Sequence, residues 1–343
     1  MSCLTPKRWT TGAALAAVMV FSAACERPPV EVVNLGFRGV GMQHVDNPRE
    51  LQDSVNAVVE REPENLPPLI GGDPAPAGTY ENVQVLGHLS AGEFNRTMLA
   101  LTQWVSPEQG CNYCHYVDDQ GQPNYASDDN YTKIVSRRML QMTQEINTNW
   151  ASHVGEDRGV NCMTCHQGQP VPNNYFFFDG PGDPLRNYVD NVGARVQGTT
   201  ALTGEGDNRQ SIKQTEYTYS LMIHMSNSLG VNCTYCHNSA RFADWDESTP
   251  QRVTALRGLR MIREQNMQHL VPLQDVWPEN RLGPLGDGPK LSCASCHNGA
   301  YRPQYNAEYT WAEGWPAINQ IGYPHENTAT ADTASAADTA TAN

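Results

Sequence analysis

Four short segments of the sequence contain two cysteines separated by two residues, with a histidine directly after the second cysteine. They read CNYCH, CMTCH, CTYCH and CASCH, and their first cysteines are residues 111, 162, 233 and 293. At this spacing the two thiols can add to the two vinyl groups of a porphyrin, and the adjacent histidine can bind its iron. The motifs therefore predict four covalently attached c-type haems, held by Cys111, Cys114, Cys162, Cys165, Cys233, Cys236, Cys293 and Cys296, with His115, His166, His237 and His297 as iron ligands.

Zinc is the alternative for this motif, because C-x-x-C pairs also form zinc ribbons. Those sites need two pairs at short separation, whereas successive motifs here begin 51, 71 and 60 residues apart. The histidine after every pair and the wide separation favour haem. The two remaining cysteines, Cys3 and Cys25, lie in the N-terminal segment, which leaves none for structural disulfides.

The sixth position of each iron separates an electron carrier from an enzyme, since a thioether or imidazole closes the metal to substrate. Met98, Met139 and Met222 lie on the segments that lead into the first three motifs, 17, 27 and 15 residues before the motif histidine. They are the candidate sixth ligands. Met142 and Met225 lie three residues further along, on the same helical faces, and we interpret them as residues that pack against haem, with iron ligation as the alternative.

Aligning these segments shows where the fourth motif differs. MLALTQWV from Met98 matches MIHMSNSL from Met222, and MLQMTQEIN from Met139 matches GLRMIREQN from Gly258. The second alignment pairs Met142 with Met261 and Asn147 with Asn266. Glycine therefore stands at the ligand position before the fourth motif, so the fourth haem takes its sixth ligand from elsewhere in the chain or stays open.

The histidines outside the motifs are the candidates for that ligand: His44, His88, His153, His224, His269 and His325. His153 follows the second helical segment in NTNWASHVGEDRG, where a turn could present it to a neighbouring haem. A histidine outside a motif is more often a surface or core residue than a ligand.

Helical periodicity precedes every motif. The segment SAGEFNRTMLALTQWV begins with Ser90 as an N-cap, with Glu93 three residues later. We predict a mainly α fold of four helix-turn-CxxCH units, in two halves related by a local pseudo-twofold axis, with long irregular connectors. Haems that supply much of the core would explain a mean hydropathy of -0.54 with 39% hydrophobic residues.

The N-terminal residues 1–24 predict a signal peptide or a membrane anchor. Lys7 and Arg8 precede an apolar run that is short for a spanning helix. Cys25 follows SAA and resembles the lipidated cysteine of a bacterial lipoprotein, although Ser22 stands where leucine is usual. An uncleaved anchor helix is the alternative.

The rest of the chain divides by composition and motif. The net charge of -14 argues against nucleic acid, and it suits either a basic soluble partner or solubility alone. We predict an extended arm, a half with the first two motifs, a connector, a half with the last two motifs and a disordered tail, at residues 25–80, 81–170, 171–210, 211–325 and 326–343.

Several segments resemble the tetrahaem cytochrome c subunit bound to the photosynthetic reaction centre of purple-type phototrophic bacteria. They are GFRGVGM, NVQVLGHLSAGEFNRTMLALTQWVSPEQGCNYCH, RRMLQMTQEINTNWASHV and SNSLGVNCTYCHN. The resemblance extends from about residue 36 to the fourth motif. It implies four axial ligand pairs, namely Met98 with His115, Met139 with His166, Met222 with His237, and His153 with His297.

The same resemblance implies a function. Such a subunit is not an enzyme; it is attached to the periplasmic face of the photosynthetic membrane, beside the reaction-centre L and M subunits. It passes electrons to their photo-oxidised bacteriochlorophyll special pair and is reduced again by a soluble cytochrome c or a high-potential iron-sulfur protein. The alternatives are a periplasmic multihaem reductase with an open fourth haem, and a free electron shuttle.

Overall fold

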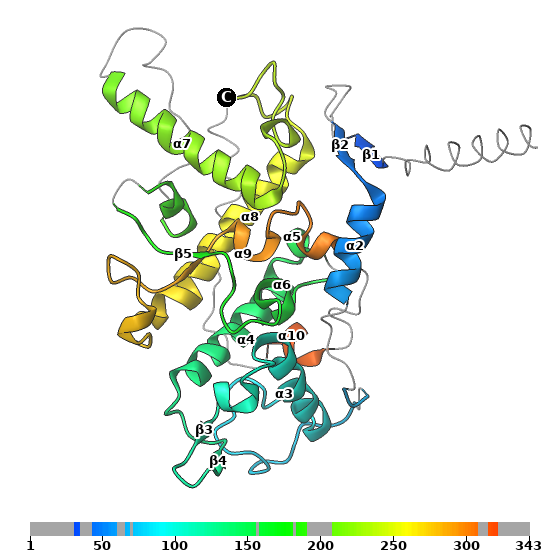
Figure 1. Cartoon of the computed structure of the whole chain (residues 1–343), viewed down its shortest axis with the longest axis vertical. Helices are drawn as coiled ribbons and strands as arrows, with labels where there is room; N and C mark the ends of the chain where they lie inside the picture. Colours follow the sequence, from blue (N-terminus) through cyan, green and yellow to red (C-terminus); the bar gives the residue numbers. More distant parts are fainter. Residues whose placement is uncertain are drawn as a thin grey trace, which may run out of the picture.

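The computed structural model describes residues 31–34, 43–59, 66–68, 71–155, 158–180, 183–190, 208–307 and 315–321. The predicted leader at residues 1–24, Cys25, His325 and the tail lie outside these residues, as does part of the predicted connector. Among the described residues helices predominate, as the sequence predicted, and the strands are short (Figure 1).

The N-terminal arm and the first half contain a strand ribbon followed by helices. The ribbon pairs β1 (Glu31–Asn34) with β2 (Gln43–Asp46) in antiparallel fashion, and a second ribbon pairs β3 with β4. The remaining elements in chain order are α2 (Pro48–Val59), α3 (Ala91–Val105), η2 (Gly110–Tyr113), β3 (Tyr116–Val117), β4 (Pro123–Asn124), α4 (Tyr131–Asn149), α5 (Ala151–Val154) and α6 (Cys162–His166).

The second half repeats long helices before its motifs. A short antiparallel pair of β5 and β6 joins the segment after the second motif to the segment before the fourth. The elements are β5 (Tyr175–Phe176), η3 (Pro184–Tyr188), α7 (Asn208–Leu229), η4 (Cys233–Tyr235), α8 (Pro250–Gln265), η5 (Asn266–Leu270), η6 (Val271–Leu273), η7 (Glu279–Arg281), β6 (Lys290–Leu291), α9 (Cys293–His297), η8 (Pro303–Asn306) and α10 (Pro316–Asn319).

The arm differs from the extended segment that the sequence predicted, because it includes α2. Asn47 caps this helix by accepting a hydrogen bond from the Arg49 N–H at 3.2 Å. Leu51 and Val55, one turn apart, are half-buried, and the helix lies against η8 near the C-terminal end of the described chain. A short amphipathic period among many prolines and glycines was too weak to predict this helix.

Local capping explains where the helices of the motifs begin and end. The Glu93 N–H donates to Ser90 Oγ at 3.2 Å, which confirms the predicted cap of α3. The helices α6 and α9 both start with a capping box, Asn161 with Thr164 and Ser292 with Ser295. Both then end on a left-handed residue, Gln167 and Asn298. The second and fourth motifs are therefore α-helical turns with the same start and stop, whereas η2 and η4 are 3-10 turns.

Two apolar clusters hold these elements together. One packs α3, α4 and α6 around Trp104, with Trp315 and Ile318 from α10 and its approach. The other gathers α7, α8 and α9 around Leu221 and Tyr188. In Figure 1, α3 and β3–β4 lie toward one end of the molecule and α7 toward the other, with α6 and α9 between them. The second and fourth motifs thus occupy the middle.

Two asparagines hold the backbone before these central motifs in the same way. The Asn147 amide donates to the Val160 carbonyl at 2.9 Å and accepts from the Val160 N–H at 2.6 Å. The Asn266 amide donates to the Leu291 carbonyl and accepts from the Leu291 N–H, both at 2.8 Å. Val160 and Leu291 each lie two residues before the first cysteine of a motif. The residues that the alignment paired therefore share one structural role.

Replacing Asn266 with alanine is expected to lower the free energy of unfolding by about 3 kcal/mol, because the fully buried amide satisfies backbone groups of Tyr188 and Leu291. Denaturant unfolding of the haem-containing protein, followed by far-ultraviolet circular dichroism, measures the loss. The control is Asn149→Ala at the exposed end of α4, with an expected change within about 0.5 kcal/mol. Equal unfolding midpoints for the two variants would contradict the role assigned to Asn266.

Candidate haem sites

The eight motif cysteines differ in burial between motifs. Burial raises the pKa of Cys162 to about 12 and the pKa of Cys293 to about 11. It also raises the pKa of Cys114 and Cys236 to about 11. These thiols are therefore neutral at pH 7. A thioether is neutral as well, so covalent attachment through these sulfurs adds no charge to an apolar setting.

Three of the four motif histidines are oriented by a backbone carbonyl. The Nδ1–H of His166 donates to the Gln169 carbonyl, and that of His297 donates to the Ala300 carbonyl, both at 2.9 Å. The Nδ1–H of His237 donates to the Phe242 carbonyl at 2.9 Å. A proton held on Nδ1 leaves the Nε2 lone pair for a metal, which is the usual arrangement of a metal-binding histidine.

Burial also selects the form of imidazole that binds metals. It lowers the pKa of His297 to about 4 and lowers the pKa of His166, so both rings are neutral at pH 7. Only a neutral imidazole has a free lone pair. His115 differs from the other three, because its Nδ1 is buried without a hydrogen-bond partner.

The three candidate methionine ligands lie on the helices expected for them. Met98 on α3, Met139 on α4 and Met222 on α7 are all partly buried and pack against the two apolar clusters. The Thr102 hydroxyl donates to the Met98 carbonyl at 2.9 Å and lies 3.9 Å from Cys111 Sγ, so this turn of α3 is next to the first motif. Met142 and Met225 are buried in the second cluster, as predicted for packing residues.

His153 lies against the glycine that replaces the fourth methionine. A Cβ placed on Gly258 would lie 2.6 Å from His153 Cε1 and 3.0 Å from His153 Nε2. Real Cβ atoms do not approach other atoms so closely, so the imidazole occupies the space that the side chain of any other residue at position 258 would need. The helix α5 that carries His153 contacts α8, and α8 contacts α9, whose last residue is His297. The structure thus brings together the two histidines that the resemblance pairs.

The other histidines outside the motifs have different surroundings. His269 Nε2 lies 2.8 Å from a Glu145 carboxylate oxygen in a buried pair. His88 lies 3.4 Å from the Pro316 carbonyl, and His224 packs edge-on against Tyr188. Among these histidines of the described residues, His153 is the one that lies against Gly258.

The second and fourth motifs are direct neighbours. Cys165 Sγ and Cys296 Sγ are 2.7 Å apart, longer than a disulfide bond, and α6 contacts α9. The Ser295 hydroxyl donates to the Asn174 carbonyl at 2.6 Å, and the Gln304 amide donates to the Met163 carbonyl at 3.0 Å. Segments from both halves of the sequence therefore build one central region.

Sequence reasoning missed the part played by the residues after the second motif. Residues 171–190 were assigned to a connector, yet Tyr188 is fully buried and its hydroxyl donates to Cys293 Sγ at 3.4 Å. Phe176 packs near Tyr188, with ring centroids 6.1 Å apart. The aromatic run from Tyr175 to Phe178 was the available signal, because aromatic residues at this density usually belong to a core.

The comparison with known proteins decides the family. The family described as photosynthetic reaction centre cytochrome C subunit matches residues 26–180 and 179–319 of this chain. The chain belongs to this family. A cytochrome c subunit carries haem c attached through cysteine, so haem, and not zinc, is the cofactor of this family.

Individual members of the family confirm the assignment over most of the length. The chain is 44% identical to the photosynthetic reaction center cytochrome c subunit of Rubrivivax gelatinosus, with 86% of this chain and 85% of the relative covered. It is 40% identical to the subunit of Thermochromatium tepidum, with 92% and 82% covered. It is 42% identical to the subunit of Roseobacter denitrificans, with 71% and 74% covered. In the described part of this cytochrome subunit, the helices are all too short or too polar to cross a membrane.

Proposed function

We propose that this chain is a tetrahaem electron carrier bound to the periplasmic face of a photosynthetic reaction centre, where it re-reduces the photo-oxidised bacteriochlorophyll special pair. The names of its relatives support association with a reaction centre, and therefore with a membrane. Four CxxCH motifs support four haems. A soluble cytochrome c or a high-potential iron-sulfur protein would supply the electrons, and the net charge of -14 suits a basic donor. The L and M subunits are the proposed partners within the complex.

We assign the axial ligands as three methionine–histidine pairs and one histidine pair. The pairs are Met98 with His115, Met139 with His166, Met222 with His237, and His153 with His297. The contact between His153 and Gly258 is the observation that carries the proposal, because it places an imidazole where the fourth methionine is missing. A closed sixth position excludes substrate, which favours a carrier over a reductase.

The proposed pseudo-twofold relation between the halves has support from repeated hydrogen bonds. Beyond the asparagine pair, the Thr249 hydroxyl donates to the Tyr235 carbonyl at 2.6 Å, and the Thr132 hydroxyl donates to the Tyr113 carbonyl. Tyr113 and Tyr235 occupy the same place in the first and third motifs, and each threonine lies at the start of the next long helix. The first motif thus corresponds to the third, and the second to the fourth.

The protein's own residues hold and insulate the redox centres. When bound, haem supplies a one-electron couple whose potential rises when methionine replaces histidine as a ligand. The backbone carbonyls of Gln169, Phe242 and Ala300 fix the orientation of three proximal imidazoles. Buried side chains such as Tyr188 exclude water from the fourth motif. The four sites therefore differ in ligands and in burial, which predicts unequal potentials.

Flash photolysis of membranes that contain this protein tests the proposed function. The membranes are washed free of soluble cytochrome, and the methionine-ligated haems are reduced before the flash. Oxidation of c-type haem within microseconds of one flash is the expected result, and membranes without this chain are the control. If the bacteriochlorophyll pair is oxidised and no haem responds, the chain is a free shuttle or a reductase instead.

A further inference from the structure

His115 is the exception among the motif histidines, and its surroundings differ from the others. The histidines of the other three motifs each donate from Nδ1 to a carbonyl at 2.9 Å, whereas His115 Nδ1 is buried without such a bond. The nearest counterpart of these carbonyls belongs to Tyr125, whose ring lies edge-on to His115 at 5.0 Å. The Tyr125 carbonyl makes no such hydrogen bond with His115 Nδ1.

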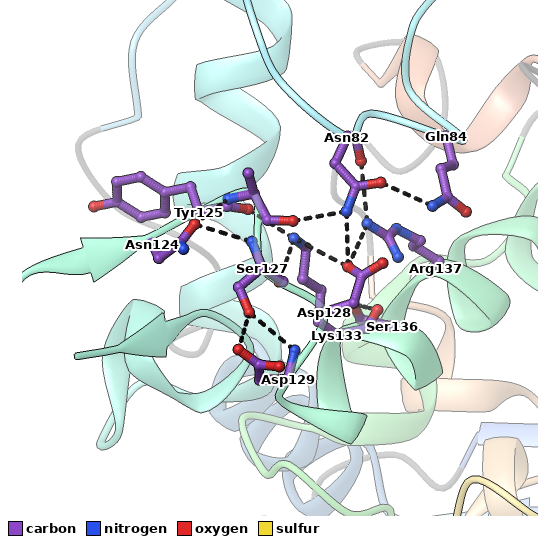
Figure 2. A network of polar contacts seen from close by, with 11 residues as sticks. Asn82, Gln84, Asn124, Tyr125, Ser127, Asp128, Asp129, Lys133, Ser136 and Arg137 are labelled. Atoms are coloured by element: carbon purple, nitrogen blue, oxygen red, sulfur yellow. Dashed lines mark hydrogen bonds and ion pairs between the residues drawn. The ribbon is translucent and has the colours of Figure 1, made fainter. Parts of the chain in front are cut away.

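The Tyr125 carbonyl is instead bound by a buried cation. Lys133 Nζ donates to the carbonyls of Tyr125 and Ser127, both at 2.7 Å (Figure 2). The Lys133 side chain is only 9% exposed. An ammonium group in such a setting keeps much of its electrostatic effect, because little water screens it. Lys133 therefore holds the loop after the first motif onto α4 and places a fixed positive charge near His115.

A carboxylate and a second cation complete the network. Asp128 Oδ1 lies 2.8 Å from Arg137 Nη2 and 3.3 Å from Lys133 Nζ, and it accepts from the Asn82 amide at 3.0 Å (Figure 2). The hydrogen bond from Arg137 holds the pKa of Asp128 well below its usual range, so the carboxylate is charged at neutral pH. The network contains two cations, Lys133 and Arg137, and two carboxylates, Asp128 and Asp129, the second of which accepts from the Ser127 hydroxyl at 2.5 Å (Figure 2). Lys133 Nζ is bound to the Tyr125 carbonyl, and the Tyr125 ring packs edge-on against His115, so the ammonium group is held next to the imidazole.

We propose that Lys133 and Asp128 are positioning residues that set the reduction potential of the haem held by His115. This inference rests on the proposed role of His115 as an iron ligand. An oxidised haem carries one more positive charge than a reduced one, so the Lys133 ammonium raises the potential and the Asp128 carboxylate lowers it. Lys133 also acts in a second way, because it binds the Tyr125 carbonyl. A carbonyl that accepted a hydrogen bond from His115 Nδ1–H would make the imidazole a stronger electron donor to iron.

The second half of the chain provides a matched control. Arg252 lies 119 residues after Lys133, the same interval that separates Met139 from Gly258. Arg252 donates to the Asp244 carbonyl at 2.7 Å and to the Ser248 hydroxyl at 2.6 Å, in the loop whose Phe242 carbonyl accepts from His237. It is therefore the cation next to the third motif that corresponds to Lys133 next to the first.

The test is a redox titration of the purified full-length protein with its haems attached, followed at the α-band. The haem of the first motif is identified with the variant Met98→His, which is expected to shift the midpoint potential of that haem alone. In Lys133→Gln the equilibrium constant for its reduction is expected to fall about tenfold, which is about 59 mV for one electron. Asp128→Asn is expected to shift the same haem in the opposite direction, and Lys133→Arg to restore the parent value. Arg252→Gln is expected to shift the haem of the third motif instead.

Two results would overturn the inference. One is a midpoint of the first-motif haem that stays unchanged in both Lys133→Gln and Asp128→Asn. The other is a shift of all haems in the same direction by both variants, which would indicate a structural role alone. The titration needs no reaction centre, so its outcome is independent of the flash experiment that tests the proposed function. If Lys133→Gln does not fold, Asp128→Asn and Lys133→Arg still decide between the outcomes.

Discussion

Replacing His153 with alanine is expected to open the fourth haem of the protein. The imidazole lies in the space left by Gly258, and no methionine stands at this position of α8 to replace it. A haem without its sixth ligand becomes high-spin when oxidised and binds small external ligands. Electron paramagnetic resonance of the oxidised variant should therefore show one high-spin haem among three low-spin haems, and the reduced variant should bind carbon monoxide at one site.

The controls for this variant separate ligation from folding. The haem content should stay at four per chain in both the parent and the variant, because the cysteines are untouched. His88→Ala removes another histidine outside the motifs, one whose ring nitrogen lies 3.4 Å from the Pro316 carbonyl. It should leave every haem low-spin. A fully low-spin His153→Ala protein would show that another residue closes the fourth iron.

Replacing Gly258 with alanine is expected to give the same high-spin signal by a different route. The added Cβ would lie 2.6 Å from His153 Cε1, so the ring must leave its position. The helix itself tolerates the change, because alanine is a better helix former than glycine. The measurement is again the spin state of the oxidised protein. Gly87→Ala is the control, since a Cβ there meets nothing within 4 Å.

A double variant tests whether His153 and the missing methionine are interchangeable. Gly258→Met combined with His153→Ala should restore a low-spin haem with methionine as its sixth ligand. The potential of this haem should then rise by a sizeable part of the about 0.8 V range that axial ligands span, because methionine raises the potential relative to histidine. A double variant that remains high-spin would contradict the equivalence of Gly258 with Met139.

The chemistry of this protein is largely readable from its sequence, because covalent haem attachment depends on residues that are adjacent in the chain. Two cysteines and a histidine within five residues form one helical turn, and their spacing alone predicts a c-type haem site. Helical periodicity located α3, α4, α7 and α8. The alignment of these segments showed that Gly258 stands where the second segment has the candidate ligand Met139. Ser90 and Glu93 predicted the start of α3 for the same local reason.

Tertiary structure decided the relations between distant segments. It brought His153 against Gly258, placed the second motif beside the fourth, and buried Tyr188 of the predicted connector against Cys293. It also revealed the charge network next to His115, whose members lie up to 55 residues apart in the chain. No local spacing encodes such contacts, because they depend on how helices pack once their apolar faces are buried.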